Sequence, residues 1–205
     1  MEHFGLRAPI KEQLEAILLD YPGGQLLAEA LQNAEDSKAT EFSLVLDECH
    51  HHGVDDQLSG PAFLLLDNGC GFSDREWRSL QNLNRSEKKN VPGEIGRYGM
   101  GSRSYFHYSD VTLVASCGKY VGIDPLNRVK SHDRGEAGGW MLDLSHPSPA
   151  DTSHPVVDEY NNIFESLELV APNFYVDNKG AAFRLPLRRT SEVKEGLGGG
   201  GGICR

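Results

Sequence analysis

Two short blocks of polar residues and glycines could carry chemistry in this sequence. Glu29 and Asn33 lie four residues apart in a stretch with helical spacing, so both side chains are predicted to project from one helix face. A carboxylate beside a carboxamide oxygen suits a water-activating base next to a magnesium ligand. Asp67 follows an apolar run and precedes Gly69 and Gly71, and glycines at such positions let backbone approach a flat ligand.

A glycine-rich loop follows these blocks and predicts a phosphate cradle. It contains Gly96, Arg97, Gly99, Met100 and Gly101. Glycines can turn successive backbone N–H groups toward an anion, so these amides are expected to be the main phosphate ligands. The surrounding stretch 84–103 carries five basic and two acidic side chains and is interpreted as a lid. Three such blocks in this order indicate a nucleotide site.

Hydrophobic periodicity predicts the elements that position these residues. Helices are expected over 10–18, 26–34 and 74–83, and strands over 41–47, 62–66, 111–117, 119–123, 139–144 and 182–187. In the first of these strands Phe42, Leu44 and Leu46 are expected to point inward, and the polar segment 48–60 is expected to be a loop. The order indicates an α/β (α+β) two-layer sandwich, with a mixed, mostly antiparallel sheet and helices on one face.

Length and composition narrow the class of protein. A chain of 205 residues with 39% hydrophobic and 24% charged residues fits one soluble globular domain. A net charge of −10 argues against nucleic acid and against anionic membrane surfaces as partners. Four cysteines without metal-ligand spacing indicate reduced thiols in an intracellular protein, in the cytoplasm or alternatively the nucleus. The glycine-rich end predicts a domain over 1–190 and a flexible tail or linker over 191–205.

The ordered motifs resemble the GHKL (Bergerat-fold) ATPase superfamily. Within it the chain is most similar to the sacsin family, whose proteins carry heat-shock-protein-90-like ATPase modules. The resemblance covers about residues 6–189. It rests on the blocks 21–24, 32–41, 67–72, 95–101 and 183–188, together with His107, Asp110 and the pair Asp124-Pro125. A single glycine motif would be weak support, whereas the ordered set is specific.

The resemblance implies roles for individual residues. Glu29 would orient or deprotonate the attacking water, and Asn33 would bind Mg²⁺ through its side-chain oxygen. Asp67 would accept the adenine amino hydrogen, which favours adenine over guanine because guanine presents a carbonyl there. Ala181 stands where the family usually has a threonine that supports water-mediated adenine contacts. The missing hydroxyl should weaken ATP binding by about 0.5–1.5 kcal/mol.

Each assignment has a plainer structural alternative. Glu29 could lie on a solvated helix face, and Asp67 could initiate a turn. Cys70 is interpreted as a small apolar filler, and the segment 49–52 as an exposed loop tip, not a metal site. Ser102 departs from the family's apolar residue at that point, which puts the packing of the lid in doubt.

These observations predict an ATP-binding domain of the sacsin and heat-shock-90-like type. Its ligands would be ATP or ADP with Mg²⁺, and slow hydrolysis would drive lid closure and a chaperone-type conformational change, with client proteins or co-chaperones as partners. An alternative is a noncatalytic nucleotide-gated scaffold that depends on a following domain of a longer protein. A histidine-kinase-like domain is less favoured, because Glu35 and Asp36 follow Asn33-Ala34 where kinases usually have a lysine.

Overall fold

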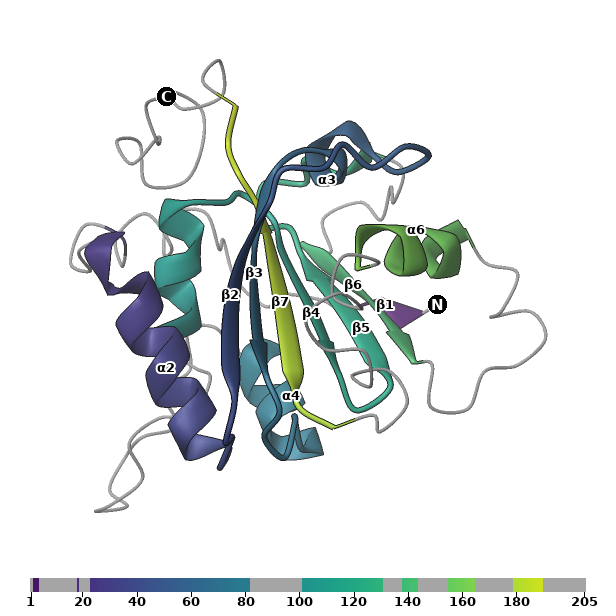
Figure 1. Ribbon diagram of the computed structural model, residues 1–205. Helices are drawn as coiled ribbons and strands as arrows, with labels where there is room; N and C mark the ends of the chain where they lie inside the picture. Colours follow the sequence, from purple (N-terminus) through teal and green to yellow (C-terminus); the bar gives the residue numbers. More distant parts are fainter. Residues whose placement is uncertain are drawn as a thin grey trace.

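A seven-stranded antiparallel sheet is the centre of the structure. The computed structural model describes residues 2–3, 18, 23–81, 101–130, 138–143, 155–164 and 179–189. Its strands are β1 (Glu2–His3), β2 (Phe42–Asp47), β3 (Ala62–Asp67), β4 (Thr112–Ser116), β5 (Lys119–Ile123), β6 (Gly139–Asp143) and β7 (Ala181–Pro186). They follow the order β1-β6-β5-β4-β7-β3-β2, and all neighbouring pairs are antiparallel. The last of these strands in the sequence, β7, therefore lies inside the sheet, between β4 and β3 (Figure 1).

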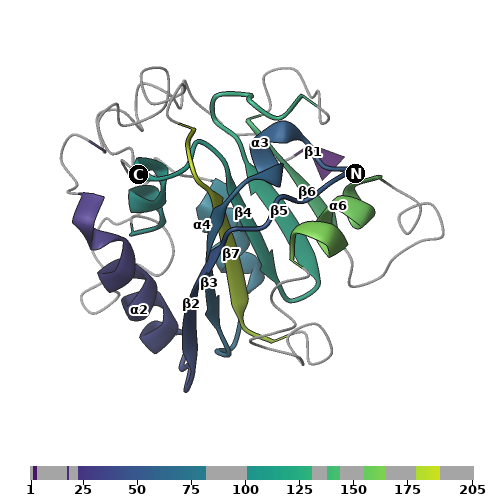
Figure 2. The same ribbon diagram turned by 45° about the horizontal axis from the view of Figure 1, so that its top comes forward.

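Helices cover both faces of this sheet. The helices are α2 (Leu26–Asp36), α3 (Asp56–Ser59), α4 (Asp74–Gln81) and α6 (Pro155–Ile163), with 3-10 helices η1 (Gly23–Gln25) and η2 (Gly101–His107). α2, α4 and η2 share one apolar cluster with alternate residues of the central strands, including Leu65 and Phe183. A second cluster on the other face includes Leu58 of α3 and Phe164 directly after α6. Figure 2 shows α2 and α6 separated by the sheet.

The α+β sandwich and its mostly antiparallel sheet are confirmed, and the expected strands agree with the structure within one or two residues at their ends. The second face was expected to be uncovered, but α3 and α6 pack on it. α3 lies inside the segment expected to be a loop, because Asp55 accepts a hydrogen bond from Gln57 N and caps a single helical turn. Of the expected helix over 10–18, only Leu18 belongs to the described residues.

The inward orientation expected for Leu44 and Leu46 is wrong. Their side chains are 45% and 51% exposed. β2 is an edge strand, and within the part of the chain that the structure describes it pairs with β3 alone. An alternating pattern identifies the two faces of a strand but does not show whether an edge face is covered.

No helix among the described residues is long and apolar enough to cross a bilayer.

A buried charged cluster lies at the end of the sheet where β2 ends. Asp47 Oδ2 is 2.8 Å from His51 Nε2 and 3.5 Å from Arg184 Nη2, and Arg184 is fully buried. The segment 49–52 is therefore not wholly an exposed loop tip, since His51 is buried against Asp47. Burial alone would raise the pKa of Asp47. The hydrogen bonds from His51 and Cys49 N and the charge of Arg184 together lower it by more, so the pKa of Asp47 lies below its usual value. Burial lowers the pKa of Arg184 to about 10, an effect the nearby Asp47 charge opposes.

We expect Asp47→Asn to destabilise the fold by roughly 3–5 kcal/mol, because it leaves the buried Arg184 charge without its counter-charge. A carboxylate with a depressed folded-state pKa contributes stability above its unfolded pKa and loses it as the pH falls through the folded value. The variant should therefore lose less stability than the wild type as the pH drops below about 4. Urea unfolding at several pH values measures both effects.

The double variant Asp47→Asn with Arg184→Met is the control for that prediction. It removes both charges, so it should recover a large part of the lost stability. Strictly additive losses from the two single changes would contradict the interpretation of the cluster as a stabilising ion pair.

Candidate functional site

Asp67 occupies a buried position at the end of β3 and is 5% exposed. Its Oδ1 accepts a hydrogen bond from Gly69 N at 2.8 Å, and Ser37 Oγ lies 3.1 Å away. The Ser37 hydroxyl has one hydrogen and also lies 2.8 Å from Ala34 O, so it shares its donor between two acceptors. Gly69 N is thus the one dedicated donor to Asp67 that the described residues provide.

The electrostatics of Asp67 differ from those of a turn-forming aspartate. Burial raises the pKa of its carboxyl above the usual value, and the bonds from Gly69 N and Ser37 offset this only in part. No cation among the described residues forms an ion pair with it. A desolvated acceptor of this kind gains free energy when a ligand supplies further N–H donors.

Hydrogen bonds of Asn68 and Cys70 hold the loop after Asp67 in place. Asn68 Oδ1 accepts from the backbone N–H groups of Thr40 and Glu41, each at 2.9 Å, and this ties β3 to the turn after α2. Cys70 N donates to Ser37 O at 2.9 Å. A side chain at position 69 would place its Cβ 2.0 Å from Ser37 Oγ, so only glycine permits this close approach. The loop is therefore built against the end of α2.

α2 ends so that its last turn meets this loop. Lys38 has a left-handed φ of 62°, its N–H bonds Glu35 O, and Ala39 N bonds Ala34 O. These two bonds form a Schellman motif, in which a lysine occupies the position that usually holds glycine. The motif terminates α2 and directs the chain toward β2 beside Asp67.

The inner face of α2 brings Glu29 and Asn33 toward the same region. Asn33 is 6% exposed, and its Nδ2 lies 3.5 Å from the hydroxyl of Tyr105 on η2. Burial raises the pKa of Tyr105, the bond from Asn33 lowers it, and the carboxylates of Glu29 and Asp67 raise it further. Both carboxylates therefore lie within electrostatic reach of one phenol, and Glu29 is half-buried. Asn33 thus contacts Tyr105, and the charges of Glu29 and Asp67 act on the same phenol.

Ala181 lies directly beside Asp67 in the sheet. The two residues are register partners between β3 and β7, and Ala181 is fully buried. On its other side Ala181 pairs with Ser116 of β4, whose Oγ donates to Gly180 O at 2.6 Å and accepts from Phe72 N at 2.9 Å. Ser116 supplies a hydroxyl next to the position where the resemblance leads one to expect a threonine.

The expected phosphate loop falls largely outside the described residues. Gly96, Arg97, Gly99 and Met100 lie there, and their predicted role stays a prediction. Gly101 is the first residue of η2, so the end of the expected lid is helical. Arg103 belongs to that helix and is buried, not exposed in a solvated loop.

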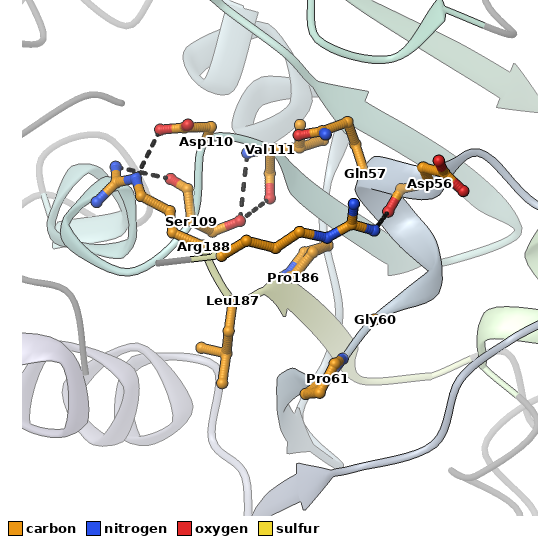
Figure 3. Close-up of a pocket in the computed structure, with 11 residues that line it drawn as sticks. Asp56, Gln57, Gly60, Pro61, Ser109, Asp110, Val111, Pro186, Leu187 and Arg188 are labelled. Carbon is orange, nitrogen blue, oxygen red and sulfur yellow. Dashed lines mark hydrogen bonds and ion pairs between the residues drawn. The ribbon is translucent and has the colours of Figure 1, made fainter. Parts of the chain in front are cut away.

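A groove at the opposite end of the sheet does not coincide with these residues. It is lined by the start of β3, the end of β7 and the turn before β4, including Pro61, Pro186 and Val111 (Figure 3). Arg188 is one of the lining residues and donates to Asp110 Oδ1 at 2.8 Å and to His107 O at 2.7 Å, which holds the C-terminal end of η2. We assign this groove a structural role at the end of η2.

The side chains of Asn33 and Glu29 both carry oxygen atoms, which are the ligand atoms that Mg²⁺ prefers. The described residues contain no group of three or more His, Cys, Asp or Glu side chains able to hold a metal. That is compatible with Mg²⁺, since this ion is commonly held by one or two protein oxygens together with phosphate oxygens and waters.

Sequence reasoning missed three residues of this region: Ser37, Asn68 and Tyr105. Their partners lie about 30 to 70 residues away in the chain, and each looks ordinary within its own segment. Only the Asn-Gly pair after Asp67 carried a local signal, and it indicated a turn.

Comparison with known proteins supports a family assignment. A family model described as the Sacsin domain matches residues 7–198. Among curated proteins, the chain is 33% identical to Sacsin of Homo sapiens over 190 residues, which are 88% of this chain and 4% of that protein. It is 31% identical to Protein NO VEIN of Arabidopsis thaliana over 98 residues, or 48% of this chain and 3% of that protein. The chain therefore spans a very small part of either relative.

We expect Asp67→Asn to stabilise the ligand-free protein at neutral pH, by about 0.5–2 kcal/mol, because it removes a desolvated charge while keeping an acceptor oxygen. A carboxyl whose folded pKa is raised contributes stability below its unfolded pKa and loses it as the pH rises through the folded value. The gain should thus shrink as the pH falls toward 4. Thermal unfolding measured across this pH range tests it, with the exposed Asp158→Asn as control. A variant less stable than wild type at pH 7 would contradict the electrostatic account.

Proposed function

The chain belongs to the Sacsin domain family, and on that premise we propose that it is an adenine-nucleotide-binding module of the sacsin type. The proposal concerns this domain alone. The activity of the much longer relatives is not transferred to it, because the chain matches only 4% and 3% of their length.

One observation carries the proposal. Asp67 is a buried carboxylate with a raised pKa, one dedicated donor and no cation partner among the described residues. Such an arrangement costs folding free energy and is explained if a ligand supplies the missing donors. An exocyclic amino group donates two hydrogens, whereas the carbonyl of guanine at the corresponding position only accepts. The carboxylate therefore selects adenine.

The residues of α2 suit the phosphate end of such a ligand. Asn33 Oδ1 would be the ligand atom toward Mg²⁺, and its Nδ2 contact with Tyr105 would fix the orientation of the amide. The bound ion would neutralise phosphate charge. Glu29 lies one turn earlier on the same face and is half-buried, a position from which a carboxylate can orient or deprotonate a water. On this basis we propose slow Mg²⁺-dependent ATP hydrolysis.

A second candidate function is noncatalytic nucleotide-gated binding. It is favoured by Arg103, which is buried within η2, and by Arg188, which is engaged with backbone carbonyls and Asp110. Neither cation is therefore placed as a solvent-facing partner for phosphate. In this case a nucleotide would bind and order the domain without turnover, and a basic side chain from elsewhere would be required for hydrolysis.

We expect Asp67→Asn to reduce ATP affinity by roughly ten- to a hundredfold, because a hydrogen bond to a charged group contributes about 1.5–3 kcal/mol. Asparagine can also present an N–H donor, so the preference for ATP over GTP should narrow. Calorimetric titration of both nucleotides in the presence of Mg²⁺ measures the two effects. Asp158→Asn on α6, an exposed aspartate on the other face, should titrate like wild type.

Equal ATP affinity in wild type and Asp67→Asn would reject Asp67 as the adenine contact. Absence of ATP binding by the wild-type protein at millimolar concentration would reject the proposed function itself.

Substitutions on α2 separate binding from turnover. Glu29→Gln should keep ATP affinity within about threefold and lower the rate of phosphate release at least tenfold, since a general base contributes 10²–10⁴ in rate. Asn33→Ala should lose the part of ATP affinity that depends on Mg²⁺ and keep the part measured in EDTA. Gln32→Ala, which alters an exposed residue of the same helix, is the matched control. Wild-type turnover in Glu29→Gln would show that Glu29 is not the base, and no turnover in the wild type would favour the noncatalytic function.

A further inference from the structure

Two cysteines from separate loops lie close together beside Asp67. Cys70 lies in the loop after β3, and Cys117 lies at the tip of the hairpin between β4 and β5. Cys117 Sγ is 3.8 Å from Cys70 O although the residues are 47 positions apart. Both are free thiols, with Cys70 exposed and Cys117 partly exposed. The interpretation of Cys70 as a small apolar filler is therefore wrong, because its side chain is exposed.

Flanking contacts hold these two loops together. Phe72 N donates to Ser116 Oγ at 2.9 Å, and Lys119 Nζ forms an ion pair with Asp74 Oδ1 at 3.2 Å. The residues on both sides of Cys117 are thus paired with residues that follow Cys70. The contact of Cys117 with Cys70 is thus one of several between these two segments, so the proximity of the two cysteines does not depend on one surface contact.

The geometry is compatible with a bond between the sulfurs. A carbonyl oxygen lies about 2.4 Å from the Cα of its own residue, so the observed contact places Cys117 Sγ within roughly 6 Å of Cys70 Cα. A disulfide brings the two sulfur atoms to about 2.05 Å from each other, so closing the bond requires the two loops to shift toward each other. Rotation of the exposed Cys70 side chain, with a small shift of its loop, can bring Sγ to Cys117.

The hairpin turn itself does not account for a cysteine. Cys117 and Gly118 have φ values of 48° and 71°, which are the left-handed conformations of a two-residue type I′ turn. Asparagine, aspartate or glycine is preferred at the first of these positions, and a cysteine there is strained.

We propose that Cys70 and Cys117 form a site of oxidative modification that closes a disulfide next to Asp67. Hydrogen peroxide oxidises one thiol to a sulfenic acid, and the peroxide is reduced to water. The second thiol then attacks the sulfenic sulfur, the S–S bond forms, and a second water leaves. Two electrons pass from the thiol pair to the peroxide.

The bond would change the loop that lines the candidate adenine site, an effect that rests on the proposed function. Cys70 N donates to Ser37 O at 2.9 Å on one side, and its carbonyl faces Cys117 on the other. Closing the disulfide draws Cys70 toward the hairpin and strains its bond to α2. Since that bond holds Gly69 and Asp67 in place, the oxidised protein should bind ATP several-fold more weakly.

Peptide mapping by mass spectrometry tests the site without reference to nucleotides. The full chain is treated with hydrogen peroxide, remaining thiols are alkylated, and the digest is compared with and without reductant. A peptide pair joining Cys70 to Cys117 is expected in the wild type and in Cys49→Ser, and neither Cys70→Ser nor Cys117→Ser should give it. Linkage to Cys49 or Cys204, or no intramolecular linkage, would overturn the proposal.

The effect of the disulfide on nucleotide binding is tested by ATP titration. Three proteins are compared: the reduced wild type, the oxidised wild type and the double variant Cys70→Ser with Cys117→Ser. The proposed effect is supported if only the oxidised wild type binds ATP more weakly, and if dithiothreitol restores its affinity. Equal affinity in a protein shown to carry the disulfide would overturn the effect on the adenine loop. If no form binds ATP, the proposed function fails, and the peptide map still decides whether the disulfide site exists.

Discussion

Burial of the Asp67 carboxylate at the end of β3 is the constraint on which the arrangement around it depends. The helix α2 covers that strand end, so each polar atom there needs a partner from a neighbouring loop. Asn68 ties β3 to the turn after α2, Cys70 bonds the end of α2, and Gly69 donates its amide to the carboxylate. The position that remains short of donors is the carboxylate itself. Under the proposed function, a ligand with N–H groups would complete the arrangement.

Asp47 is a second buried aspartate at a strand end, and its contacts give it a structural role. It ends β2 as Asp67 ends β3, but the two strands are antiparallel, so the carboxylates lie at opposite ends of the sheet. Asp47 is within 3.5 Å of both His51 and the buried Arg184, and its pKa is lowered. Asp67 has no such cation among the described residues, and its pKa is raised. Opposite shifts in two buried strand-end carboxylates distinguish a stabilising ion pair from a candidate ligand site.

Much of the fold was predictable because its signals are local. The continuous apolar run 62–66 identified β3 and placed Asp67 at its end, and helical spacing put Glu29 and Asn33 on one face of α2. The missing parts depend on contacts between distant segments. The alternating pattern predicted that Leu44 and Leu46 point inward, but they are exposed because β2 lies at an edge of the sheet. The polar segment around His51 was predicted to be exposed, but His51 is buried because it pairs with Asp47. Tyr105 joins the candidate site only through η2 packing on α2, which no local pattern announces.

The protonation of Asp67 in the free and nucleotide-bound protein is the most direct test of this account. Its carboxyl ¹³C chemical shift can be followed by NMR as a function of pH, with Asp158 as an exposed internal reference. In the free protein we expect a pKa for Asp67 above the usual value of an aspartate, because burial disfavours the charge. We expect a lower pKa with ATP bound, because the adenine amino group donates to the ionised form. A pKa of ordinary value that does not change when ATP is added would contradict the central claim that this carboxylate is held ready for adenine.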